Sequence, residues 1–124
     1  RRAIDNIMTR LRSMVEETGA GIILVSHLRR IDGNKGHENG IEVSLSHLRG
    51  SNSIAQLSDC VIALERNQQS DDELVSRTTR LRILKSRYTG DVGLATNLIY
   101  DTETGRLHEQ DLSELEPDDQ ELLL

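Results

Sequence analysis

The chain has 124 residues, enough for one domain or part of one with a modest hydrophobic core. Its formal net charge of −6 is concentrated at the carboxyl end. Residues 109–124 hold seven acidic side chains and no Lys or Arg, which leaves 14 acidic against 15 basic residues in the body. Two Tyr, no Phe and no Trp argue against a surface that binds single strands by stacking bases on aromatic rings.

The apolar runs and the single cysteine indicate the cellular compartment. No apolar run approaches the ~20 residues that span a bilayer, and no signal-peptide pattern opens the chain. Cys60 cannot form a disulfide within the chain, which suits a reducing cytosol, and we expect it to be a small buried hydrophobe. We therefore expect a cytoplasmic protein with no membrane partner.

The first segment has the pattern of an amphipathic helix. Gly19 and Gly21 are expected to end it. The pattern is already running at Arg1, which indicates a fragment of a longer chain. Its apolar positions recur at spacings of three and four, at Ile4, Ile7, Met8, Leu11, Met14 and Val15.

Residues 21–27 are uncharged and rich in β-branched side chains, which predicts a buried strand. A helix, a glycine turn and then a buried strand are typical of an α/β unit with a parallel sheet. In such sheets ligands bind beyond the carboxyl ends of the strands, where Ser26 and His27 would lie. His27 is therefore a candidate ligand contact, and a hydrogen-bonded surface histidine is the other interpretation.

Two basic loops follow. Residues 28–46 are interrupted by glycines and asparagines, and they carry Arg29 and Lys35; a loop of this length is either functional or a mobile connection. Residues 49–52 (Arg-Gly-Ser-Asn) form the second loop, in which a glycine permits close approach to a ligand. A metal site is not expected, because the spacing of the candidate ligands does not resemble a tetrahedral zinc motif. These candidates are His27, His37, His47 and Cys60.

Further elements are predicted from residue 54 onward. A short helical pattern covers 54–57, and the uncharged run 60–64 predicts a strand buried on both faces of a parallel sheet. Residues 80–85 alternate charged and apolar side chains, as in a half-exposed strand. Residues 94–100, the turn 101–105 and residues 106–108 predict an antiparallel hairpin at one edge of the sheet.

The last segment, residues 109–124, has the composition of a disordered acidic tail. Such a tail is either a solubilising extension or a docking peptide for a basic partner surface. We expect it to be separate from a folded portion over residues 1–108.

An ordered set of short motifs carries a family resemblance. The set is His27-Leu28 and the segments 48–51, 56–59, 63–69 and 84–93. In this order they resemble the carboxyl-terminal helicase domain of the phage T7 type primase-helicases, which are ring-forming, RecA-like motors. The resemblance covers about residues 1–108. It implies part of a RecA-like P-loop NTPase core, with a mostly parallel sheet flanked by helices and an antiparallel edge hairpin.

The resemblance also implies roles for individual residues. His27 matches the sensor of the γ-phosphate, and Gln56 matches the glutamine that links the DNA loop to the nucleotide. Arg87 matches the arginine finger that reaches into the neighbouring subunit's site, with Lys85 as its basic companion. Arg66 and Tyr100 match the pair that sandwiches the base of the nucleotide. The positions that match DNA contacts are Arg29, Lys35, Arg49 and Gly50.

By the same resemblance, the parent protein would be a hexameric replicative helicase of a bacterial or phage-infected cytoplasm. It would move 5′ to 3′ on single-stranded DNA using Mg²⁺ and a nucleoside triphosphate, dTTP or ATP. No G-x-x-x-x-G-K-[ST] phosphate loop occurs in the 124 residues, and the family's Walker B aspartate would precede Arg1, so we expect no hydrolysis by this chain alone. The acidic tail would dock a replicative polymerase or a single-strand-binding protein.

Two other functions stay open from the sequence. One is a different RecA-like ATPase, such as a recombinase, that uses the same strand-end chemistry to assemble a filament or a ring. The other is a non-catalytic module that binds DNA or a polymerase and uses the fold only as a scaffold. Unwinding of a forked duplex by the parent protein would separate the helicase from the other RecA-like ATPase, and binding of single-stranded DNA without nucleotide dependence would favour the non-catalytic module.

Overall fold

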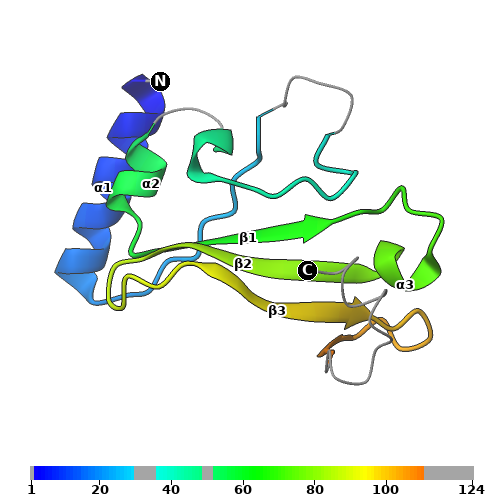
Figure 1. Ribbon diagram of the computed structural model, residues 1–124. Coiled ribbons are helices and arrows are strands. Elements are labelled where there is room, and N and C mark those ends of the chain that lie inside the picture. The colour runs from blue at the N-terminus through cyan, green and yellow to red at the C-terminus, as the bar shows by residue number, and fades with distance from the viewer. Residues whose placement is uncertain (1, 30–35, 49–51, 111–124) are drawn as a thin grey trace.

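In the computed structural model, which describes residues 2–29, 36–48 and 52–110, helices flank the two ends of a four-stranded sheet (Figure 1). Helix α1 (Arg2–Thr18) packs beside the short α2 (Ser53–Leu57) at one end of the sheet. The short α3 (Glu73–Ser76) lies at the other end, in the connection between the first two strands. A single 3-10 turn, η1 (Leu45–His47), precedes α2.

The predicted amphipathic helix is confirmed as α1. Met8 is buried, with Ile4, Leu11 and Val15 half-buried along the same face. Gly19 ends the helix as expected: its N–H donates to the Val15 carbonyl at 2.9 Å, and its φ of 73° is favourable only for glycine.

The sheet is antiparallel throughout, in the order β1-β2-β3-β4. The expectation of mostly parallel strands does not match these described residues, because the connections are too short for parallel crossovers, which need a dozen or more residues. The predicted edge hairpin is confirmed by β3 and β4. The strands are β1 (Cys60–Arg66), β2 (Thr78–Ser86), β3 (Gly93–Tyr100) and β4 (Leu107–Glu109).

The strand predicted at residues 21–27 is wrong for this structure. The segment forms no strand, with Ile23 96% and Val25 86% exposed. A strand requires hydrogen-bonding partners on a neighbouring strand, and the described part of the chain supplies none beside this segment. The apolar pattern alone therefore did not decide whether this segment pairs as a strand.

Strand β1 is also less buried than predicted. It is an edge strand of this sheet, and Ile62 and Leu64 on its outer face are 56% and 63% exposed. Cys60, expected to be buried, is exposed as well. Only the inner face of β1 is buried, at Ala63 and Glu65.

A buried carboxylate, that of Glu65, joins the inner face of the sheet to the loop that precedes η1. Glu65 is 2% exposed, and one oxygen accepts a hydrogen bond from the backbone N–H of Val43 at 2.8 Å. Arg80 Nε donates to Glu65 Oε1 at 3.1 Å, and Arg82 Nε donates to Oε2 at 2.7 Å. Burial alone would raise the pKa of Glu65, but the hydrogen bonds from Arg82 and Val43 and the charges of both arginines outweigh it, so the pKa is lowered.

The same loop approaches the sheet closely at Gly40. A side chain there would bring Cβ to 2.9 Å from Asn67 Cβ, and the φ of 80° also favours glycine. The Gly40 carbonyl accepts a hydrogen bond from Arg80 Nη2, and Asn39 forms a bridge with Asn67. The loop is therefore fixed to β1 and β2 at several points.

Helices in the described residues are all too short or too polar to cross a bilayer.

We predict that Glu65→Gln in the intact protein destabilises β1 and β2 by about 3 kcal/mol, because it leaves two partly buried arginines without their counter-charge. This corresponds to roughly 100-fold faster hydrogen exchange in peptides covering the two strands. Since the folded pKa of Glu65 is lowered, its contribution is complete above the ordinary value of 4.5 and is lost as pH falls through the folded pKa. The variant should therefore lose less protection on acidification than the wild type does.

Glu42→Gln is the matched control. Its side chain is 73% exposed, and its carboxylate lies 3.5 Å from Arg82 Nη1. The free energy of opening measured by hydrogen exchange should therefore change by less than about 0.5 kcal/mol. Equal effects of the two substitutions would contradict a central role for Glu65.

Candidate nucleotide and DNA interface

Three of the four residues in the predicted catalytic set gather at the carboxyl end of α2. Lys85 Nζ donates to the carbonyls of Ala55 and Gln56, at 2.7 and 3.1 Å. Arg87 Nη2 donates to the same Gln56 carbonyl at 3.1 Å. Two cations near the end of β2 thus satisfy carbonyl groups that the last turn of a helix leaves unpaired.

Asp59 completes this group, which we call the α2-end cluster: Gln56, Asp59, Lys85 and Arg87. Arg87 Nη1 lies 2.7 Å from Asp59 Oδ1, and the Arg87 backbone N–H donates to the Asp59 carbonyl at 2.8 Å. The Gln56 side chain is exposed, so only its backbone takes part. The cluster leaves that amide available to other groups.

His27 does not belong to the hydrogen-bond network of the α2-end cluster. Its side chain is exposed, and the segment that carries it forms no strand, so it does not lie at a strand end as expected. Its role as a phosphate sensor stays a prediction.

The two residues predicted to hold the base lie at the opposite end of the sheet. Arg66 ends β1 and Tyr100 ends β3, and both are exposed. Because Arg66 pairs with Thr79, which pairs with Leu98, the alternation of side chains places Arg66 and Tyr100 on the same face. Arg66 Nε also donates to the Ser76 carbonyl of α3.

The length of β2 separates these two groups. Arg66 lies opposite Thr79, six residues before Lys85 in β2, so at about 3.3 Å per residue the backbones of the two groups are roughly 20 Å apart. The Arg66–Tyr100 end and the α2-end cluster therefore lie at opposite ends of the sheet.

Of the predicted DNA contacts, only Arg29 lies in the described part of the structure; Lys35, Arg49 and Gly50 lie outside the described residues. Arg29 is exposed, and its N–H donates to the His47 carbonyl at 2.9 Å. Leu28 forms an antiparallel bridge with Leu48 beside it. The residues that flank the two basic loops are thus joined directly to each other.

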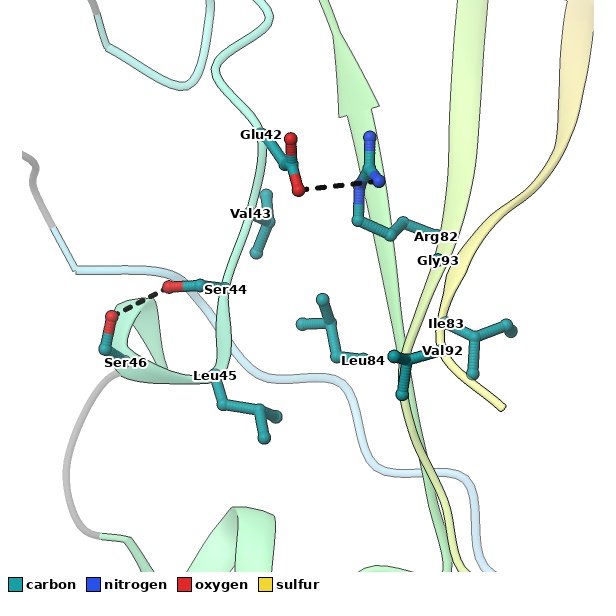
Figure 2. Close-up of a pocket in the computed structure, with 10 residues that line it drawn as sticks. All are labelled: Glu42, Val43, Ser44, Leu45, Ser46, Arg82, Ile83, Leu84, Val92 and Gly93. Atoms are coloured by element: carbon teal, nitrogen blue, oxygen red, sulfur yellow. Dashed lines mark hydrogen bonds and ion pairs between the residues drawn. The ribbon is translucent and has the colours of Figure 1, made fainter. Parts of the chain in front are cut away.

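A groove of about 450 Å³ lies between the loop preceding η1 and the strands β2 and β3 (Figure 2). Figure 2 shows Arg82 at its rim paired with Glu42, and the hydroxyls of Ser44 and Ser46 bonded to each other at 2.7 Å. None of the predicted site residues lines it. Its lining is otherwise mainly apolar, through Val43, Leu45, Ile83, Leu84 and Val92.

The sequence did not single out two features of this region. Asp59 and Glu65 fall within the segments 56–59 and 63–69 that carry the family resemblance, which implies no role for either residue. The alternation Arg80-Leu81-Arg82 was the available signal, since two arginines on one face of a strand require a counter-charge. In the described ranges no three His, Cys, Asp or Glu side chains gather as a group that could hold a metal ion.

Comparison with known proteins identifies the family. Residues 1–109 match the family described as the DnaB-like helicase C terminal domain, and the chain belongs to this family of RecA-like α/β domains.

Among known proteins, the chain is similar to a DNA helicase/primase of Enterobacteria phage T3, with 44% identity over 107 residues. The alignment covers 86% of this chain and 18% of the phage protein, so the chain spans less than a fifth of that relative's length. The resemblance to the primase-helicase family inferred from the sequence motifs is thereby confirmed.

Proposed function

We propose that this chain is the carboxyl-terminal part of a ring-forming replicative helicase, which couples nucleoside triphosphate hydrolysis to 5′ to 3′ movement on single-stranded DNA. The observation that carries the proposal is the separation of the Arg66–Tyr100 end from the α2-end cluster by the length of β2. Two such half-sites become one site when adjacent copies in a ring contribute one half each. Family membership and the phage T3 relative support the same function.

In this proposal the base lies between Arg66 and Tyr100 of one subunit, held by stacking and cation–π attraction. Arg87 of the next subunit, with Lys85 beside it, approaches the γ-phosphate, where negative charge develops during transfer. An arginine supplied in this way is worth roughly 10³ to 10⁵ in rate. Hydrolysis then depends on ring assembly, and a hexamer is the expected ring.

The triphosphate and Mg²⁺ would be held mainly by parts of the parent protein outside these 124 residues, because this sequence has no phosphate loop. Bound Mg²⁺ neutralises charge on the β- and γ-phosphates. His27 would sense the γ-phosphate, and Gln56 would pass DNA binding to the nucleotide. Residues 21–27 would become a strand of a mostly parallel sheet by pairing with those other parts, which would cover exposed Ile23 and Val25.

DNA would be held by the two basic loops, through Arg29, Lys35, Arg49 and Gly50. Backbone amides and cations give a grip on phosphates that does not depend on base sequence, as a motor needs. Since Leu28 is bridged to Leu48, the loops would present these groups together.

The acidic tail predicted over residues 109–124 would dock a basic surface of a replicative polymerase or single-strand-binding protein. Glu109 ends β4 and the Gln110 N–H donates to the Asn97 carbonyl, so the docking portion would be residues 111–124. Deleting residues 111–124 should abolish binding of that partner in a pull-down at low salt and leave DNA-stimulated hydrolysis unchanged. Retained partner binding would exclude the tail as the docking site.

We predict that Arg87→Ala in the intact protein lowers DNA-stimulated hydrolysis by about 10³-fold or more, because the charge-stabilising guanidinium is lost. Nucleotide affinity should change little, as measured with a fluorescent nucleotide analogue. Arg10→Ala on exposed α1 is the matched control and should retain wild-type activity. The isolated 124-residue chain should show no hydrolysis of dTTP or ATP with Mg²⁺.

Mixing Arg87→Ala with a phosphate-loop variant of the same protein tests whether the arginine acts between subunits. Mixed rings should regain part of the activity, since some interfaces then contain both intact halves. Full activity of Arg87→Ala by itself would refute the proposed role.

We predict that Arg49→Ala weakens single-stranded DNA binding and lowers DNA stimulation of hydrolysis. Loss of one phosphate contact should reduce the slope of log affinity against log salt by about one. Titration of a labelled oligonucleotide at several salt concentrations measures this slope, with Arg10→Ala again as control. Unchanged slope and unchanged stimulation would remove Arg49 from the DNA contacts.

A further inference from the structure

Asp59 binds a different arginine with each of its two carboxylate oxygens. Oδ1 lies 2.7 Å from Arg87 Nη1, and Oδ2 lies 2.9 Å from Arg12 Nη1 of α1. Asp59 is held in turn by the backbone, because it follows directly after Ser58, the residue that caps the end of α2, and its carbonyl accepts from the Arg87 N–H. A short side chain on a fixed backbone has little freedom to move.

Arg87 is fixed at two points and still accessible. One terminal nitrogen contacts Asp59 and the other donates to the Gln56 carbonyl at 3.1 Å, while 40% of the side chain is exposed. A guanidinium has five N–H donors, so these two contacts leave donors for a further anion. Holding a long side chain this way removes rotamer freedom before the ligand arrives, which is the physical basis of preorganisation.

Charge around the cluster requires the carboxylate. Three cations surround the end of α2, namely Arg12, Lys85 and Arg87, and Asp59 contacts two of them. The hydrogen bond from Arg12 is the largest cause that lowers the pKa of Asp59, so this carboxyl remains ionised at neutral pH. Without this charge, repulsion from Lys85 and Arg12 would favour other positions of the Arg87 guanidinium.

We propose that Asp59 is a positioning residue for hydrolysis: it holds the Arg87 guanidinium where it can reach the triphosphate of an adjacent copy, and Arg12 fixes the carboxylate from α1. This proposal rests on the proposed function of Arg87. A purely structural role would make a small difference, because ion pairs that are partly open to solvent contribute little to stability. A misplaced reacting group, in contrast, can cost about 100-fold in rate.

The test is Asp59→Asn in the intact protein, measured by steady-state hydrolysis with saturating single-stranded DNA. We expect kcat to fall by about 10- to 100-fold while KM for the nucleotide changes by less than about two-fold. The reason is that the substitution removes a contact to Arg87 and none of the groups that bind ground-state nucleotide. Asp71→Asn, an exposed aspartate in the turn before α3, is the matched control and should keep wild-type kcat and KM.

A double-mutant comparison separates this role from a general effect on folding. In an Arg87→Ala background, Asp59→Asn should lower kcat by less than about two-fold further, since both changes remove the same contribution. A full additional loss would show that Asp59 acts independently of Arg87 and would overturn the proposal.

The outcomes distinguish the two proposals. If Arg87→Ala is inactive and Asp59→Asn retains wild-type kcat, the positioning role fails and the proposed function stands. If Arg87→Ala retains full activity, the proposed function of Arg87 in hydrolysis fails as well. Should Asp59→Asn not assemble, Asp59→Glu keeps the charge but extends the side chain by one methylene; a lowered kcat supports the positioning role and an unchanged kcat overturns it.

Discussion

The buried carboxylate of Glu65 is the interaction on which the rest of this structure depends. It sits on the inner face of β1 with no exposed side-chain surface, and it accepts hydrogen bonds from both arginines of β2 and from the loop backbone at Val43. An unpaired charge at such depth is strongly unfavourable, so these contacts form together or not at all. They fix the register of β1 against β2, and that register places Arg66 and the α2-end cluster at opposite ends of the sheet.

Local elements were predictable from the sequence because their signals are local. The apolar spacing of α1 and the positive φ of Gly19 agree with the pattern-based expectation, as does the hairpin of β3 and β4. Pairing was harder to predict. Residues 21–27 and residues 60–64 of β1 are both uncharged runs rich in apolar side chains, yet only β1 has a partner strand in this part of the chain. Composition reports that a segment prefers extended backbone, but it carries no information about which strand lies beside it.

The candidate site shows a similar division. Motif order identified Gln56, Lys85 and Arg87, and the structure brings these three together around the end of α2. It could not identify Asp59 as the shared partner of Arg12 and Arg87, because these two contacts join residues 47 and 28 positions apart in the chain. The antiparallel arrangement was accessible in principle, since the six residues between β2 and β3 leave no room for a crossover.

The strand order has a consequence for how the chain folds. Each strand of the sheet hydrogen-bonds to the one that follows it along the chain, so the contacts that build the sheet join residues close in sequence. Closing short loops loses little chain entropy, and topologies of this kind reach their native pairing quickly. As the polypeptide leaves the ribosome, this meander can assemble as soon as its last strand emerges, before any second subunit is at hand.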